Sequence, residues 1–225
     1  MSPPPAARTT NDTARWLAAA LMDIGALVLR PDEPFTWASG RRAPIYCDNR
    51  LTLGYPDLRG AICRAFAGCI ASEKWEVDAI VGTATAGIPH AAWLAGRLNL
   101  PMAYVRSSAK GHGRENRVEG RLPSRARVVV VEDLVSTGMS STAVLPPLEA
   151  LGCDVLGVMA IFTYALPEAA TAFSDAGVPI VTLSSFPVLI TVAREKELLG
   201  EEECSSLEAW YRDPSAWSVA HGGSN

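Results

Sequence analysis

The sequence of 225 residues lacks the features that would mark a secreted, zinc-binding or membrane-spanning protein. It has five cysteines, an odd number, and no Cys-x-x-Cys pair, which disfavours a disulfide framework and a zinc site. The N-terminal residues have no apolar signal-peptide core, and the longest apolar candidate, residues 17–29, is interrupted by Asp23. We therefore expect a cytoplasmic protein with reduced thiols and no membrane partner.

An excess of positive charge is also missing. The formal net charge is −4, which argues against a general nucleic-acid binder, and we find no appended helix-turn-helix. The apolar fraction of 48% and the charged fraction of 20% are typical of a soluble globular protein. The length is sufficient for one well-buried core, or one core with a small appendage.

From residue 77 onwards, the pattern of apolar residues predicts alternating strands and helices. Strands are expected at 77–82, 101–105, 127–132, 154–162 and 179–183, and helices at 86–98, 139–151 and 166–176. Such alternation predicts an α/β fold, with a central parallel sheet flanked by helices on both faces.

The flanking segments are expected to be simpler. A helix should begin near Asn11 and run to about Leu29, another should span 56–74, and a third should span 201–210 before Pro214 stops it. Residues 35–53 read as two short strands around the Gly40–Pro44 turn. We divide the chain into a disordered N-terminus (1–12), N-terminal helices with a small hairpin (13–75), the α/β core (76–200), and a C-terminal helix and tail (201–225).

The most informative segment is residues 128–142. Four valines predict a buried strand, and Glu132 and Asp133 follow at its carboxyl end, where ligands bind in open α/β sheets. A loop of small hydroxyl residues and Gly138 then leads into an expected helix, whose free N–H groups favour a phosphate. Adjacent strand residues point to opposite faces, so the two acids need not share one role. This order suits a sugar phosphate, although a capped strand–turn–helix without a ligand has similar residues.

Two further loops carry glycine and charge. The segment Gly82–Gly87 is rich in small residues, but Ile88 and Pro89 occupy the positions where a P-loop needs Lys and Ser/Thr, so a P-loop kinase is excluded. Residues 106–121 hold five Lys/Arg and three Gly, and this connection is longer than usual. It is either a solvated loop or a lid over an anion.

These tracts together resemble the type I phosphoribosyltransferases. The segment Phe35–Tyr46, continued to Arg50, looks like the base-binding hood of the orotate phosphoribosyltransferase family, and the resemblance extends from about residue 16 to Trp217. It implies a type I phosphoribosyltransferase fold with a small N-terminal hood (residues 35–50). The implied reaction transfers phosphoribose from phosphoribosyl diphosphate (PRPP) to orotate with Mg²⁺, in a homodimer whose lid loop is shared across subunits.

The resemblance also implies a role for individual residues. Catalytic residues would be Asp133, Glu132, Lys110 and His112, with the two acids facing the ribose hydroxyls. PRPP would contact Arg106, Lys110, His112, Glu132, Asp133, Leu134, Val135, Ser136, Thr137, Gly138, Met139 and Ser140, and its diphosphate would contact Thr83, Ala84, Thr85 and Ala86. Orotate would contact Ser136 and the backbone near Tyr46 and Cys47. No protein ligand is assigned to the metal, because PRPP oxygens can supply most of its contacts.

The sequence departs from other branches of this family in its positive charges. Lysines of those branches are replaced by Ala38, Ala86 and Ser107, and an arginine is missing near Phe162 and Thr163. Arg50 is our candidate for the orotate carboxylate. Two alternatives stay open: a phosphoribosyltransferase for another base, and a non-catalytic PRPP-sensing regulator. His90 and His221 are interpreted as incidental.

Overall fold

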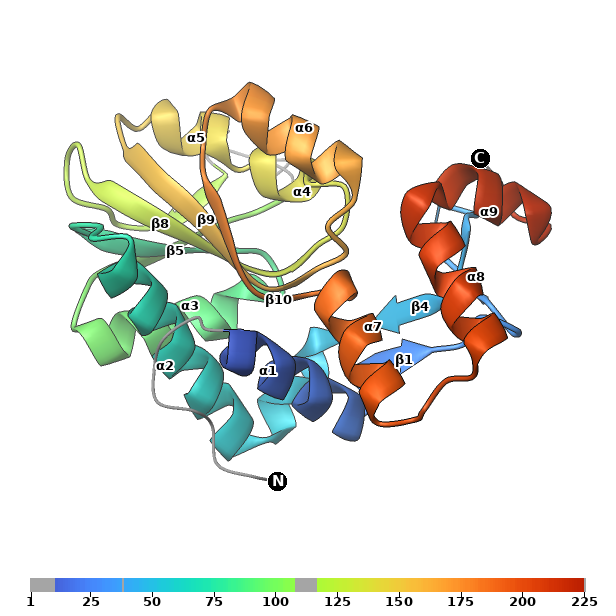
Figure 1. The fold of residues 1–225 in the computed structure, drawn as a ribbon. Helices are drawn as coiled ribbons and strands as arrows, with labels where there is room; N and C mark the ends of the chain where they lie inside the picture. Colours follow the sequence, from blue (N-terminus) through green and yellow to red (C-terminus); the bar gives the residue numbers. More distant parts are fainter. Residues whose placement is uncertain (1–10, 38, 108–116, 225) are drawn as a thin grey trace.

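The computed structural model describes residues 11–37, 39–107 and 117–224. Figure 1 shows a larger part, built around one sheet with helices on both faces, and a smaller lobe that combines short N-terminal strands with the C-terminal helices. The predictions made for residues 1–10, Ala38, Lys110 and His112 lie outside the described residues.

The central sheet has the strand order β10-β9-β8-β5-β6-β7. Its strands are β5 (Ala79–Thr83), β6 (Met102–Val105), β7 (Val118–Gly120), β8 (Arg127–Val135), β9 (Asp154–Thr163) and β10 (Ile180–Ser185). Five of them are parallel, as predicted. The exception is β7, which pairs with β6 in the antiparallel sense and lies inside the segment expected to be a loop.

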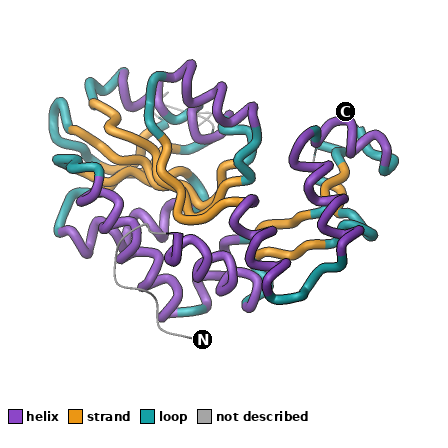
Figure 2. Tube along the Cα trace, in the orientation of Figure 1, coloured by secondary structure: helices purple, strands orange, loops and turns teal. Residues whose placement is uncertain are grey.

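Helices cover both faces of this sheet (Figures 1 and 2). One face carries α1 (Asn11–Asp23), α2 (Pro56–Ser72) and α3 (Gly87–Leu98), and the other carries α4 (Met139–Thr142), α5 (Leu145–Glu149) and α6 (Pro167–Ala176). Val129 and Val131 pack in the hydrophobic core between the sheet and α1, α2 and α3, whereas Val128 and Val130 pack in the core between the sheet and α5 and α6. The valine run is therefore buried on both faces, as its composition predicts.

Two helix predictions are wrong in their extent. The first helix ends at Asp23 rather than near Leu29, because Gly25 adopts a φ of 74° and the chain then forms strand β1 (Leu27–Leu29). The helix expected at 139–151 is divided into α4 and α5. Pro146 and Pro147 lack the N–H groups that would bond back to the preceding turn, so the helix is interrupted there.

The hood forms, but its strands pair differently from the expected hairpin. Strand β2 (Phe35–Thr36) pairs with β3 (Arg42–Ala43), whereas β4 (Ile45–Cys47) pairs with β1. The division falls at Pro44, which has no N–H to donate to a ladder. A 3₁₀ segment, η1 (Asn49–Gly54), then leads from the hood into α2.

Three helices complete the smaller lobe. The sequence prediction missed α7 (Phe186–Glu195), although Phe186, Leu189 and Ile190 give it one buried face. The helix α8 (Glu201–Arg212) is confirmed, but Pro214 begins α9 (Pro214–Ala220) instead of ending the helical region. In the part of the chain that the structure describes, no helix is long and apolar enough to cross a membrane.

Candidate active site

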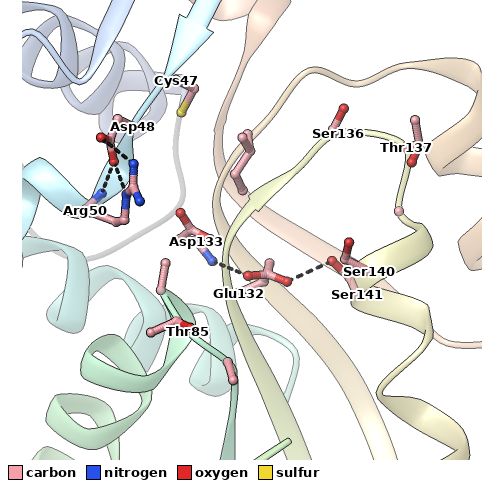
Figure 3. A pocket seen from close by; sticks show the side chains of 14 residues that line it. Cys47, Asp48, Arg50, Thr85, Glu132, Asp133, Ser136, Thr137, Ser140 and Ser141 are labelled. Atoms are coloured by element: carbon pink, nitrogen blue, oxygen red, sulfur yellow. Dashed lines mark hydrogen bonds and ion pairs between the residues drawn. The ribbon is translucent and has the colours of Figure 1, made fainter. Parts of the chain in front are cut away.

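The two predicted acids lie within strand β8 rather than after it. The strand continues to Val135, because its ladder with β9 extends from Glu132 opposite Ala160 to Val135 opposite Thr163. The two carboxyl side chains point in different directions in Figure 3, Asp133 toward the hood tract and Glu132 toward the loop after β8. This is the opposite-face arrangement that adjacent strand residues require.

Glu132 is only 7% exposed and is held by three donors. The Thr83 hydroxyl donates to its Oε1 at 2.6 Å, the Asp133 N–H donates to the same oxygen at 3.0 Å, and the Ser141 hydroxyl donates to Oε2 at 3.2 Å. Burial raises the pKa of Glu132, and the charge of Asp133 raises it further, while the Thr83 hydrogen bond opposes the shift. Glu132 therefore joins the end of β5 to helix α4.

The Asp133 side chain lines the cavity, whereas Glu132 joins neighbouring elements. Burial raises the pKa of its carboxyl group, and the nearby Arg50 guanidinium opposes that shift. The backbone oxygen of Asp133 accepts a hydrogen bond from Nδ2 of Asn49 at 2.7 Å. The side chain is thus placed beside the residues that follow strand β4 (Figure 3).

A cavity of about 480 Å³ opens between β5, β8 and the end of β4 (Figure 3). Apart from Leu134, its walls are small, hydroxyl-bearing or charged residues, and they come from three separate parts of the sequence: Cys47, Asp48, Arg50, Ala84, Thr85, Ala86, Glu132, Asp133, Leu134, Ser136, Thr137, Gly138, Ser140 and Ser141. The structure therefore brings together most of the residues that the sequence predicted to share a site. Hydroxyl groups and backbone amides of this kind suit an anionic, hydroxyl-bearing ligand.

The loop after β5 approaches β8 closely. A Cβ atom on Gly87 would lie 2.3 Å from the Val131 carbonyl oxygen, so only glycine fits at the start of α3. The peptide between Ala84 and Thr85 is cis. Through this packing, the segment predicted to hold a diphosphate forms one wall of the cavity, beside Glu132 and Asp133.

Several predicted residues do not line this cavity. Tyr46 is 42% exposed and its ring packs against Phe35, while Val135 is buried in the sheet. Thr83 is buried and reaches Glu132, and Met139 is 72% exposed beside the cavity. The predicted contact between orotate and the backbone of Tyr46 stays a prediction.

Arg106 is the first residue of the basic loop, the name used here for residues 106–121, and it lies outside the cavity walls. Its Nη1 is 3.6 Å from Oε1 of Glu119, and its backbone oxygen accepts from Nε of Arg117 at 2.9 Å. Lys110 and His112 lie outside the described residues, so their predicted roles stay predictions.

Sequence reasoning missed Asp48, Asn49 and Ser141. The carboxylate of Asp48 accepts two hydrogen bonds from the Arg50 guanidinium, of 2.6 and 2.8 Å, and both residues line the cavity. Asp48 and Asn49 lie between two residues that were named, and Ser141 follows the named residue Ser140 in α4. Their positions were therefore visible in the sequence, but the contact of Asn49 depends on Asp133, which is 84 residues away along the chain.

His90 and His221, the two histidines among the described residues, differ in their surroundings. His90, on α3, is buried, and burial lowers its pKa to about 4, so its imidazole is neutral near pH 7. Its Nε2 lies 3.4 Å from the Thr52 hydroxyl. His221 stacks on Trp217 in the C-terminal lobe, with ring centroids 3.6 Å apart. Neither histidine lines the cavity.

Comparison with known proteins identifies the family. Residues 56–182 match the model of the phosphoribosyl transferase domain. An orotate phosphoribosyltransferase of Cutibacterium acnes is 49% identical over 213 residues, which cover 95% of this chain and 99% of that protein. An orotate phosphoribosyltransferase of Halalkalibacterium halodurans is 50% identical over 202 residues, which cover 90% of this chain and 96% of that protein.

Solved structures agree with the fold. The crystal structure of orotate phosphoribosyltransferase from Aeropyrum pernix superposes with a TM-score of 0.71 at 32% identity, over 82% of this chain and 99% of that one. Its fold is the central, mostly parallel sheet flanked by helices described above. The chain belongs to the orotate phosphoribosyltransferase family, within the type I phosphoribosyltransferases.

Proposed function

We propose that this protein transfers the 5-phosphoribosyl group of PRPP to orotate, giving orotidine 5′-monophosphate and pyrophosphate in pyrimidine biosynthesis. The observation that carries the proposal is the convergence of the acid pair, the hydroxyl loop and the end of the hood on one cavity. The 49% identity to an orotate phosphoribosyltransferase over nearly the whole chain supports the choice of base.

In this reaction the bond from ribose C1 to a pyrophosphate oxygen breaks, and a bond from C1 to a ring nitrogen of orotate forms. Positive charge grows on the sugar as negative charge grows on the leaving group. Asp133 stabilises the cationic sugar from the cavity wall, and Glu132 holds the end of β5 and helix α4 in place through Thr83 and Ser141. Residues 136–140 bind the 5′-phosphate, and residues 83–86 bind the pyrophosphate.

Arg106, Lys110 and His112 of the basic loop stabilise the departing pyrophosphate in this proposal. Closure of that loop would exclude water, which would otherwise hydrolyse the activated sugar. We place the reaction in the cytoplasm, where the five cysteines would remain reduced.

The family implies a magnesium ion, and the cavity fits one that arrives with PRPP. Glu132 and Asp133 supply oxygen atoms, but among the described residues no group of three or more His, Cys, Asp or Glu is placed to hold a metal. Magnesium keeps several waters and is often held by one or two carboxylates plus substrate phosphates. When bound, it would neutralise charge on the diphosphate, and Glu132 and Asp133 are carboxylates of the cavity wall that could contribute to holding it.

One assay tests the function. Purified protein with PRPP and Mg²⁺ should consume orotate, measured as loss of orotate absorbance, and should leave adenine and uracil unchanged. Consumption of another base in place of orotate would support the first alternative. Salt-dependent nucleic-acid binding without turnover of any base would support a PRPP-sensing regulator.

Arg50 remains our candidate for the orotate carboxylate. Its guanidinium lines the cavity but is shared with Asp48, and its side chain is 64% exposed. Because a charge-assisted hydrogen bond would be lost, Arg50→Ala should raise the KM for orotate by about tenfold or more, with little change in the KM for PRPP.

Arg41 is the matched comparison for Arg50. It lines a second cavity of about 830 Å³, which shares Ser136 and Thr137 with the first, and its guanidinium donates to the Ser215 hydroxyl at 3.0 Å. If Arg41→Ala raises the orotate KM and Arg50→Ala does not, the carboxylate binds in the second cavity and the role of Arg50 is rejected.

We also propose a homodimer in which the basic loop of one subunit completes the site of the other. Mixing Lys110→Ala subunits with Asp133→Asn subunits should then restore part of the activity, because one site of each mixed dimer would contain both native residues. The rate of orotate consumption after mixing and re-equilibration measures this. Activity no higher than the sum of the two separate variants would argue against a shared site.

A further inference from the structure

We propose that Asn49 is a positioning residue that sets where Asp133 stands against the sugar, an inference that rests on the proposed function. Asn49 begins η1, shortly after strand β4, and is fully buried. Its Nδ2 donates to the backbone oxygen of Asp133 at 2.7 Å. The side chain does not line the cavity, so it acts on substrate only through Asp133.

The hydrogen bond from Asn49 reaches strand β8 beyond the point where β8 pairs with β5. The ladder between β5 and β8 ends at Val131, opposite Gly82, so the backbone of Asp133 lies beyond it. Carbonyl groups two residues apart on a strand point to the same side, and the Val131 oxygen faces β5, where it lies 3.3 Å from the hydroxyl oxygen of Thr83. Asn49 therefore occupies the place of a missing strand partner at the residue that carries the acid.

Asn49 is itself fixed by a chain of buried polar groups. The Thr52 hydroxyl donates to the Asn49 backbone oxygen at 2.6 Å and lies 3.4 Å from Nε2 of His90. His90 belongs to α3, the helix that begins after the 83–86 loop. Asn49 thus links η1, the acid-bearing strand β8 and helix α3, which follows the predicted diphosphate loop.

The oxygen atom of the Asn49 side-chain amide is relevant to the stability of the fold. Within the described residues, its Oδ1 is buried without a hydrogen-bond partner. A buried acceptor without a donor is costly, so the stability gained through Nδ2 is offset by the loss at Oδ1. Removing the whole amide should therefore affect the position of Asp133 much more than the stability of the fold.

Asn49→Ala tests this inference through PRPP binding, measured by isothermal titration calorimetry with Mg²⁺. The dissociation constant should rise about tenfold, the size of effect expected for one lost positioning contact. The midpoint of thermal unfolding should change by only a few degrees. In the Asp133→Asn background, Asn49→Ala should cause no further weakening, because the residue through which it acts is already altered.

Ser184→Ala is the matched control. Its buried hydroxyl also donates to a distant backbone oxygen, that of Ala14 at 2.8 Å, but it lies outside the cavity and should leave PRPP affinity unchanged in both backgrounds. If Asn49→Ala does not fold, Asn49→Leu removes the same donor while keeping the volume. Wild-type affinity in the folded variant, or equal weakening in both backgrounds, would overturn the inference. Failure of the native protein to bind PRPP would instead reject the proposed function.

Discussion

Asp133→Asn should lower kcat by on the order of a hundredfold or more while leaving the fold intact. Asparagine keeps the shape of the side chain but removes the negative charge that stabilises the cationic sugar. Burial already raises the pKa of the native carboxyl, so loss of its charge should not destabilise the folded protein. Steady-state rates of orotate consumption, together with thermal unfolding of both proteins, measure the two effects separately.

Asp48→Asn is the control for this substitution. Asp48 is a second carboxylate in the same cavity, but its charge is bound to Arg50. Its replacement should change kcat much less than that of Asp133, even if it alters the KM for orotate by releasing Arg50. A nearly normal kcat in Asp133→Asn would remove Asp133 from the mechanism.

Gly87→Ala should reduce kcat/KM for PRPP about a hundredfold, because displacement by about 1 Å in a site can have an effect of this size. The added Cβ would meet the Val131 carbonyl oxygen at 2.3 Å and the Thr83 hydroxyl oxygen at 2.5 Å, so the backbone must move. That movement separates β5 from β8 beside Glu132. It should also lower the free energy of unfolding by about 1–3 kcal/mol, as overpacking does.

The same helix supplies a control substitution that should raise, rather than lower, the free energy of unfolding. Gly96 also lies in α3, but a Cβ there would meet nothing within 4 Å. Gly96→Ala should therefore stabilise the protein by about 0.5–1 kcal/mol and leave kinetics unchanged. Chemical denaturation gives both free energies. Native kinetics in Gly87→Ala would show that the loop after β5 can move without harm to the site.

The core and the acid pair were predictable because their signals are local. Val128–Val131 read as a buried strand in any context, and Glu132 and Asp133 follow directly in the sequence. The different environments of the two acids were not predictable. Glu132 is held by Thr83 and Ser141, and the first of these lies 49 residues away.

The smaller lobe was predicted less well because its elements depend on contacts with distant parts of the sequence. The partner of β4 is β1, about 20 residues earlier, and no pattern within residues 35–53 indicates that pairing. The apolar run that begins at Phe186 could be either a strand or a helix, and its contact with α1 decides the outcome. Tertiary contacts determined these elements more than local propensity did.

The hydrogen bonds of the hood affect the order in which parts of the chain can fold during synthesis. Its turn is fastened by residues from the other end of the described chain: the Arg42 N–H donates to the Ser218 hydroxyl at 2.9 Å, and the Ser224 N–H donates to the Gly40 oxygen at 3.1 Å. During synthesis the ribosome releases the hood strands early, whereas the residues that fasten them emerge about 175 positions later. A nascent chain can therefore form its sheet first, and can complete these hydrogen bonds of the hood only after residues 218–224 have emerged.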